Sequence, residues 1–388
     1  MLEGRTTVYK NNVLAALTVM LLFYSFFVTI NYAFNFGIVV LPHWSVVYLP
    51  IPFIFILLFC FFSNKRIFIK SKSAIPIVFG IYVFVSILIS YCVTPFNTRF
   101  VEACFNSLTW LTIFLIPFFL RISSKTIRCI GYFSAASSIL FGFIYCVYIT
   151  RIPFTNELRA LAVNSIYYLL LLVPFVLSVD KKWIKWPTLI CSFFIIVISG
   201  KATTLIAFIL GILVYLYLSF KGKKRIVFIS VTILFLIVAF AFFRDKILSL
   251  EVAGKISSMN ETGLVNRIPI YQSIFEKYES LQFFNKLFGA GYNGVYNAIG
   301  SSAHNDFLEV LFDYGLFGLL LYILMIFGFI RNAFVLIKRN SDYSAAFVAA
   351  LAIFIVCSLT SELIFIPRYF FFLAFFLSSI INLGGDKK

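Results

Sequence analysis

His304 is the residue with the clearest chemical potential, and it is one of two histidines in the chain. It begins the run HNDFLEVLFDYGLFG, so Asn305, Asp306 and Glu309 follow it closely. An imidazole at a membrane surface can act as a base at neutral pH, and Asp306 or Glu309 could serve as the base instead. Asp306 could also simply cap the helix that follows, although this alternative leaves the neighbouring imidazole unexplained.

Basic residues near the ends of apolar runs form a second candidate set. Arg159 and Lys201 each begin an apolar run, Arg267 precedes a short predicted helix, and Glu362 and Arg368 flank the last predicted outer loop. If the apolar runs span a membrane, charged residues at their ends are costly to place there and usually face a cavity or one another. The four cations could together bind a phosphate-bearing substrate, since the arginine fork suits a diphosphate, or each could extend to the interface alone. The supporting polar residues are Asn164, Tyr271 and Asn305.

The composition shows what kind of protein must position these residues. Of 388 residues, 62% are hydrophobic and 12% are charged, with 51 Phe and 21 Tyr. Soluble domains average roughly 45–50% apolar and 25% charged residues. These values exclude an ordinary soluble enzyme, a disordered chain and a small disulfide scaffold. The chain is therefore expected to be an all-α polytopic membrane protein.

Apolar runs of about 20 residues, the length that crosses a bilayer, recur along the whole chain. Most of the 32 basic residues lie in every second connection between these runs, together with the two termini. Because cytoplasmic loops are enriched in Lys and Arg, both termini are expected in the cytoplasm. The sequence lacks the ten-residue segments of alternating apolar and polar residues that are typical of a membrane β-barrel. The predicted spans are 12–33, 45–62, 74–94, 103–120, 127–149, 160–179, 184–199, 202–220, 226–243, 307–330, 344–361 and 364–383.

The spans divide the chain around one long outer segment. Residues 1–243 would carry transmembrane helices one to nine, 244–306 a long periplasmic loop, and 307–388 helices ten to twelve with a cytoplasmic tail. Within the loop a helix is predicted from Pro269 to about Tyr278, because proline suits a first helical turn. The stretch 287–306 is rich in Gly, Asn and Ser and is predicted to be an ordered loop, where function often resides.

Other classes of site find little support in the residue pattern. The seven cysteines show no CxxC spacing, so neither a disulfide framework nor a metal site is indicated, and they are expected to be small core residues. The net charge of +17 follows from the topology, and no basic soluble domain is present to bind nucleic acid. No cofactor is predicted.

The run HNDFLEVLFDYGLFG resembles the O-antigen ligase and polymerase family of membrane glycosyltransferases (the WaaL/Wzy type). That family has a His-Asn pair after a glycine-rich outer loop, then a helix with an acidic residue and two spaced glycines. The matching positions here are His304, Asn305, Glu309, Gly315 and Gly318.

Three other segments resemble the family in the same order. RALAVNSIYYLLLL, from Arg159, is similar to the Arg…Asn opening of a span in the middle of the chain. ISGKATTLIAFILG is similar to a Ser-Arg-Gly segment, with Lys201 where arginine is usual. NRIPIYQSIF and LFGAGYNGVY, which surround Arg267 and the glycines after it, resemble the Arg-helix-GxG part of the long loop.

The resemblance implies a GT-C-like fold and a donor glycan carried on undecaprenyl diphosphate at the periplasmic face of a bacterial inner membrane. It implies no nucleotide sugar, cofactor or metal. In this scheme His304 is the base or orients the acceptor, Arg159 and Arg267 hold the diphosphate, and Lys201 and Arg368 are secondary contacts. His304 could instead bind phosphate while an acidic neighbour acts as the base.

The acceptor is left open by the sequence. A polymerase moves the chain onto another lipid-linked repeat unit, a ligase moves it onto lipid A-core, and a chain-length regulator is a possible partner. The modest loop and the lysine at position 201 favour the polymerase. A flippase for the same lipid-linked sugar is a more distant alternative, because transporters usually consist of two related halves and the halves here do not match.

Overall fold

The structure is a computed structural model, and residues 14–24, 27, 50–63, 74–93, 100–120, 122–151, 156–220, 222, 225–227, 230, 264–364 and 367–383 are described. Across these ranges the chain forms helices and short connections and no β-strand. After an N-terminal helix, Leu14–Tyr24, the elements are α3 (Pro50–Ser63), α4 (Ala74–Val93), α5 (Phe100–Leu120), α6 (Ser124–Arg151), α7 (Asn156–Leu177), α8 (Lys182–Ser199), α9 (Ala202–Ser219), α12 (Leu264–Glu279), α13 (Phe283–Phe288), α14 (Gly294–Ile299), α15 (Asp306–Lys338), α16 (Ser344–Thr360) and α17 (Pro367–Leu383).

The helices agree with the expected membrane protein. Among the described residues, α4, α6, α8, α9 and α15 are long and apolar enough to cross a bilayer. Each predicted span except the ninth overlaps a described apolar helix. The ninth, 226–243, lies mostly outside the described residues. The number of twelve spans and the GT-C-like fold therefore remain predictions.

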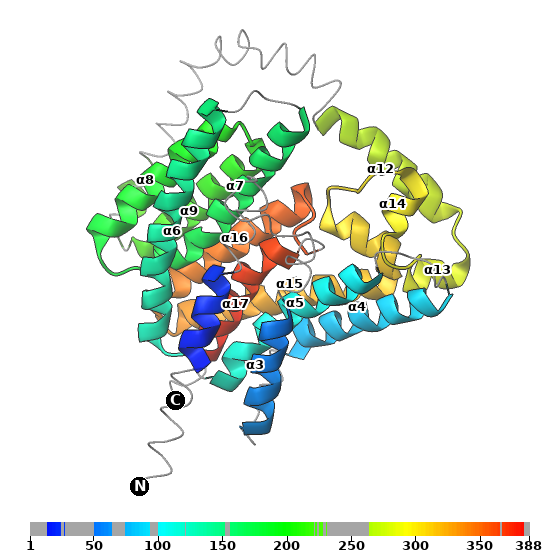
Figure 1. Ribbon diagram of the computed structural model, residues 1–388, viewed down its shortest axis with the longest axis horizontal. Helices are drawn as coiled ribbons and strands as arrows, with labels where there is room; N and C mark the ends of the chain where they lie inside the picture. The colour runs from blue at the N-terminus through cyan, green and yellow to red at the C-terminus, as the bar shows by residue number, and fades with distance from the viewer. Residues whose placement is uncertain are drawn as a thin grey trace.

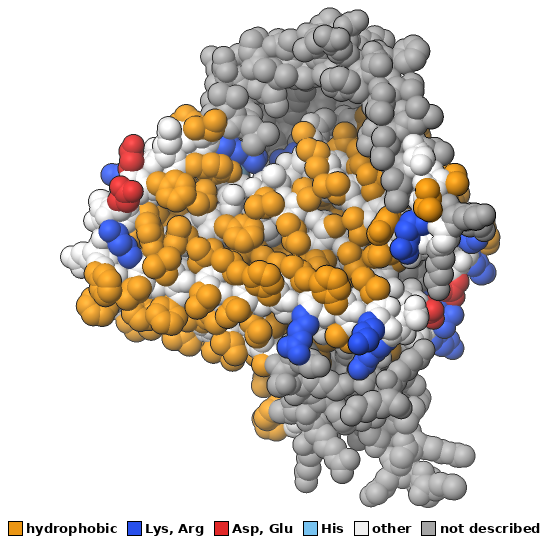
Figure 2. Space-filling model, turned by 180° about the vertical axis from the view of Figure 1, so that it is seen from behind, with side chains coloured by type: hydrophobic (Ala, Val, Ile, Leu, Met, Phe, Trp, Pro, Cys, Tyr) orange, Lys and Arg blue, Asp and Glu red, His pale blue; other side chains and the backbone are white. Residues whose placement is uncertain are grey.

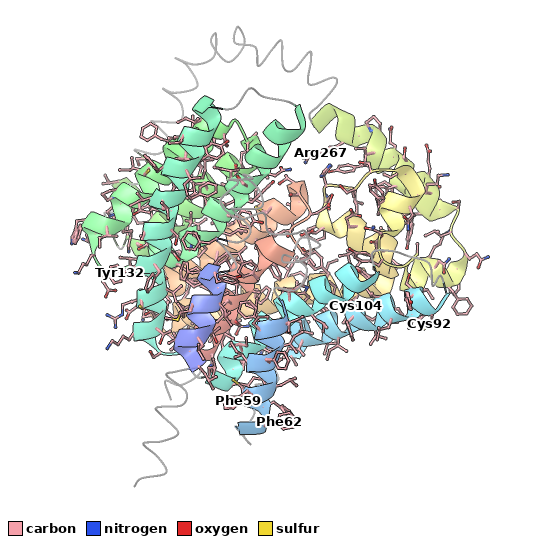
Figure 3. The ribbon with its side chains drawn as sticks, viewed as in Figure 1. Phe59, Phe62, Cys92, Cys104, Tyr132 and Arg267 are labelled. Atoms are coloured by element: carbon pink, nitrogen blue, oxygen red, sulfur yellow. The ribbon has the colours of Figure 1, made fainter. Side chains whose placement is uncertain are left out.

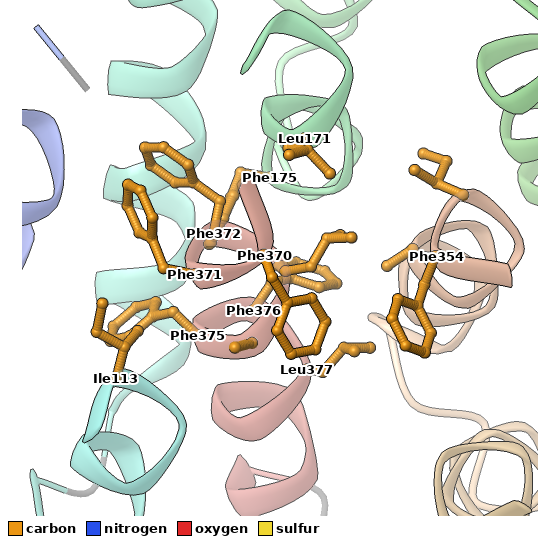
Figure 4. Close-up of a cluster of buried hydrophobic side chains, with 14 of the residues drawn as sticks. Ile113, Leu171, Phe175, Phe354, Phe370, Phe371, Phe372, Phe375, Phe376 and Leu377 are labelled. Atoms are coloured by element: carbon orange, nitrogen blue, oxygen red, sulfur yellow. The ribbon is translucent and has the colours of Figure 1, made fainter. Parts of the chain in front are cut away.

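The core is built around α17, which lies in the middle of the bundle beside α5, α7 and α16 (Figure 1). Its Phe370 ring lies 5.5 Å from Trp110 of α5 and 5.2 Å from Phe354 of α16, and Phe376 lies 4.9 Å from Phe175 of α7. Figure 4 shows the phenylalanine rings of α17 extending from several sides of the helix, toward Phe175 and Phe354 among others. A helix that is apolar all round must be buried, and α17 is buried throughout residues 370–380, which include five of the 51 phenylalanines.

The outer surface is also largely apolar. Figure 2 shows a broad, continuous hydrophobic surface across one face, with the charged side chains gathered toward its margins. The expectation that the cysteines are core residues holds only in part. Cys60 and Cys357 are buried, whereas Cys92, Cys129 and Cys146 are exposed on this kind of surface.

The connections at one end of the bundle are joined by polar contacts. The Arg128 guanidinium lies 2.8 Å from the Asp180 carboxylate, and the Tyr343 hydroxyl donates to the backbone carbonyl of Ser124. At the opposite end of α8, Gly200 adopts a left-handed conformation (φ 67°) and closes the short turn to Lys201. These contacts and the Gly200 turn lie toward opposite ends of α8, whose 18 residues extend about 27 Å.

The long outer segment contains more helix than the sequence predicts. Pro269 does not begin its helix, because α12 starts five residues earlier, at Leu264. The stretch predicted to be a loop holds α14 and the end of α13. The glycines of this stretch allow backbone conformations that other residues rarely adopt, since Gly289, Gly291 and Gly300 all have positive φ.

A break at Gly315 divides α15 into two parts. Gly315 has φ 69° and ψ −171°, and a side chain there would overlap the Leu287 carbonyl. The backbone carbonyls before the break lose their usual helical donors four residues on. The Phe312 carbonyl instead accepts from Ala290 N–H at 2.8 Å and the Asp313 carbonyl from Gly291 N–H at 3.0 Å. The break therefore docks the glycine-rich segment onto α15.

Candidate active site

The start of α15 positions the His-Asn pair. Asn305 is the N-cap, and its side-chain oxygen accepts hydrogen bonds from the backbone N–H groups of Phe307 and Leu308. Its amide also donates to the Leu359 carbonyl of α16 at 3.2 Å. The interpretation of Asp306 as the cap is therefore wrong, because the residue before it has the extended backbone conformation that a cap requires.

Asp306 is instead fully buried at the contact between helices. One carboxylate oxygen accepts from the Ile364 N–H, and the other accepts from the Tyr322 hydroxyl, both at 3.4 Å. The Tyr322 hydroxyl is also hydrogen-bonded to the Ser358 hydroxyl of α16, with the two oxygens 2.9 Å apart. Asp306 thus ties the beginning of α15 to the connection between α16 and α17, which carries Glu362.

The next two acidic residues of α15 hold the loop that precedes His304. Glu309 accepts from the backbone N–H of Ala303 at 3.1 Å, and Asp313 accepts from that of Val295 at 2.9 Å. Both carboxylates are buried. Asp306 and these two residues lie on successive turns of α15, and each fixes a different part of the outer structure.

His304 is paired with Glu362, a residue 58 positions later in the chain. The backbone N–H of His304 donates to Glu362 Oε1 at 3.2 Å, and the imidazole Nδ1 lies 3.3 Å from the same oxygen. The His304 side chain is 49% exposed and that of Glu362 15%. Because Nδ1 faces the carboxylate, Nε2 is the nitrogen that could meet a substrate. Sequence reasoning noted Glu362 beside the last outer loop without making it a site candidate.

The backbone at His304 is strained. Its φ of 50° lies in the left-handed region, which residues with a side chain adopt at a cost of about 1–3 kcal/mol. The Asn305 cap, the Glu309 contact to Ala303 and the Glu362 contact surround this position. Strain that is held in place from several sides is typical of functional positions.

Two of the predicted cations lie near this pair. Lys201 Nζ donates to Asn164 Oδ1 at 2.8 Å and lies 5.4 Å from the centre of the Tyr167 ring. Arg267 donates through Nη1 to the Thr360 carbonyl at 3.0 Å, which places it between α12 and the end of α16 (Figure 3). The structure therefore brings together α7, α9, α12, α15 and α16 at one end of the bundle.

These groups affect one another electrostatically. Burial lowers the pKa of the Lys201 ammonium, and the nearby Arg267 lowers it further. Burial also lowers the pKa of His304, with Arg267 and Lys201 acting in the same direction and Glu362 opposing them. The imidazole is accordingly neutral at neutral pH and available to accept a proton, with Glu362 in contact and Arg267 and Lys201 close enough to influence it.

For Arg159 and Arg368, the structure shows the helix that carries each residue but not the position of its side chain. Arg159 lies in the first turns of α7, in the same helix as Asn164, and Arg368 lies at the start of α17. Their side chains are not among those that the structure describes. Tyr271 lies one turn after Arg267 in α12. In the described part of the chain, no group of three or more His, Cys, Asp or Glu residues is arranged to hold a metal ion.

Part of the chain matches a known protein family. Residues 187–323 match the family model described as O-antigen ligase. The match includes Lys201, Arg267, His304, Asn305, Gly315 and Gly318, and it leaves Arg159, Glu362 and Arg368 outside. No curated protein matches the chain. Over residues 187–323 the chain is therefore similar to the O-antigen ligase family, whose members are membrane glycosyltransferases of the ligase and polymerase type.

Proposed function

We propose that the chain is a polysaccharide polymerase that transfers a glycan from undecaprenyl diphosphate to a hydroxyl group of another lipid-linked repeat unit. The reaction would take place at the periplasmic face of a bacterial inner membrane. The observation that carries the proposal is the His304–Glu362 pair near Lys201 and Arg267. Three of these four residues, His304, Lys201 and Arg267, lie in the stretch that matches the family model.

The cations would bind the diphosphate of the donor. Arg267 uses Nη1 for the Thr360 carbonyl, which leaves other guanidinium nitrogens for phosphate oxygens. Lys201 supplies a point charge whose position is set by Asn164 and Tyr167. Arg159 and Arg368 would complete the site from the first turns of α7 and α17. Positive charge here stabilises the diphosphate as it departs.

His304 would act as the base in the transfer step. The acceptor hydroxyl oxygen attacks the anomeric carbon, and the bond from that carbon to the diphosphate oxygen breaks. The hydroxyl proton passes to His304 Nε2, and undecaprenyl diphosphate leaves with the bonding electrons. Direct attack inverts the anomeric carbon. Glu362 would hold the imidazole through Nδ1 and stabilise the imidazolium that forms.

Asp306 and Glu309 fit a positioning role better than that of the base. Asp306 is 0% exposed and Glu309 6%, and both accept backbone hydrogen bonds that fix the outer connections. With these carboxylates turned inward, His304 is the exposed proton acceptor of the motif. Asn305 would support it by setting where α15 begins.

The ligase reaction is the second candidate, because the matching family model is described as O-antigen ligase. Both reactions use the same donor site and differ in the acceptor, which is lipid A-core for the ligase. Lys201 in place of the usual arginine and the modest size of the outer segment are the features that favour the polymerase.

Deletion of the gene in its own host distinguishes these functions. The surface glycolipid would be separated on a gel beside an extract of the undecaprenyl-linked pool. Core with a single repeat unit and no ladder is the expected result and identifies a polymerase. Bare core with long glycan still on the lipid carrier would identify a ligase. Bare core with single lipid-linked units held on the cytoplasmic side would identify a flippase and contradict glycan transfer.

A further inference from the structure

The short helix α13 exposes aromatic side chains where a soluble surface would carry polar ones. Phe283 and Phe284 are 69% and 71% exposed, and Phe288 at the other end of the helix is 49% exposed. Exposed apolar patches of this kind usually mark a contact surface. The neighbouring helix α12 instead carries exposed charged residues, including Glu276, Lys277 and Glu279.

The aromatic patch is continuous with the apolar side of α15. The Phe288 ring stacks on the Phe317 ring of α15 with centroids 5.3 Å apart and planes only 2° from parallel. Phe317 is itself 48% exposed, and Leu316 and Leu320 beside it are about half exposed. The length and composition of α15 suit it to cross the membrane, and lipid would then cover its exposed apolar side. Lipid would then also cover the aromatic patch of α13, because that patch adjoins the apolar side of α15.

The length of α15 places this patch at the outer edge of the hydrocarbon layer. Its 33 residues extend roughly 50 Å, well beyond the roughly 30 Å of hydrocarbon. The part after Gly315 is roughly 34 Å long, which is enough to span the layer by itself. The part before it carries the buried acidic residues and belongs with the outer structure. The outer boundary therefore falls near Gly315, where α13 docks against the helix.

We infer that α13 is an anchor in the outer leaflet, with Phe283 and Phe284 inserted among the lipid acyl chains and Phe288 joining them to α15. Phenylalanine side chains inserted at this boundary bind a short helix to a bilayer without crossing it. The anchor would fix the depth of the segment from Gly289 to His304, because the backbone of that segment is hydrogen-bonded to α15 just after α13 ends. The inference depends on α15 crossing the membrane and is independent of the reaction catalysed.

A tryptophan placed on α13 tests this directly. The full chain with Phe284→Trp would be reconstituted in vesicles of phosphatidylethanolamine and phosphatidylglycerol, some brominated near the headgroup end of the acyl chain. Subtracting the emission of the parent protein removes the contribution of its four tryptophans. Glu276→Trp, on the charged exposed side of α12, is the matched control, and Phe283→Trp is a second position on α13.

The tryptophan introduced at position 284 is expected to be quenched several times more strongly by the brominated lipid than the one at position 276. Aqueous iodide should show the reverse order. Equal quenching of both positions by iodide would overturn the inference, because α13 would then face water. Protection of position 284 from both quenchers would overturn it as well, because a protein surface rather than lipid would then cover the patch.

Discussion

At the level of single residues, His304 and Glu362 depend on each other. Glu362 holds both the backbone N–H and the imidazole Nδ1 of His304, and it opposes the lowering of the His304 pKa by burial, Arg267 and Lys201. The sequence allowed His304 and Asn305 to be predicted because they form a local motif. The Glu362 contact spans 58 residues and depends on how α15 and α16 pack, which no local pattern reveals.

Glu362→Gln should lower the rate of glycan transfer about tenfold, a fraction of the roughly 10²–10⁴-fold that a general base contributes. The glutamine can still accept the backbone hydrogen bond, so the fold should be kept. Loss of the negative charge removes the one influence that raises the pKa of His304, so that pKa should fall further. Activity declines when His304 becomes protonated, and the acid limb of the pH–rate profile should therefore move to lower pH. An unchanged pH profile would limit Glu362 to a structural role.

Arg267→Lys should reduce transfer nearly as much as Arg267→Ala. A guanidinium can donate to the Thr360 carbonyl and to phosphate oxygens at once, whereas a single ammonium cannot reproduce that geometry. A charged hydrogen bond contributes roughly 1.5–3 kcal/mol, so both variants should lose about 10- to 100-fold in kcat/KM. Lys277→Ala, an exposed change in the same helix, is the control. Wild-type activity of the lysine variant would exclude bidentate contact.

At the level of elements, the outer structure is organised by the break in α15. The apolar pattern predicted one uninterrupted span over 307–330, because hydropathy does not register where a helix changes direction. The helix α12 and the tight turn at Gly200 could be anticipated from local residues. The docking of Ala290 and Gly291 onto the freed carbonyls could not, since it requires the tertiary structure.

Gly315→Ala should destabilise the protein. The added side chain would overlap the Leu287 carbonyl, and the conformation at φ 69°, ψ −171° is essentially confined to glycine, so it costs another residue about 1–3 kcal/mol before that overlap is counted. Gly328→Ala is the matched control in the same helix, because nothing lies within 4 Å of the position its side chain would take. The control should be neutral or stabilised by about 0.5–1 kcal/mol. Thermal unfolding of both proteins in detergent is the measurement, and equal midpoints would show that the break is not required.

At the level of the whole molecule, the polar contacts lie at two ends of an apolar bundle. The Arg128–Asp180 pair joins two connections that the distribution of basic residues predicts to be cytoplasmic. The candidate site lies near the opposite end of α8, beside Gly200 and Lys201. The hydrophobic composition predicted membrane helices well, because apolar length is a property of each segment alone. It did not predict that α17 would occupy the centre, which depends on how the segments pack.

Glycan transfer by the reconstituted full chain, with and without His304→Ala, tests the central claim most directly. Vesicles containing the protein and a glycan linked to undecaprenyl diphosphate would be sampled for longer lipid-linked products and for released undecaprenyl diphosphate. We expect the parent protein to form both products and His304→Ala to lose at least about 100-fold in rate. Activity of the variant within a few-fold of the parent would contradict the assignment of His304 as the base.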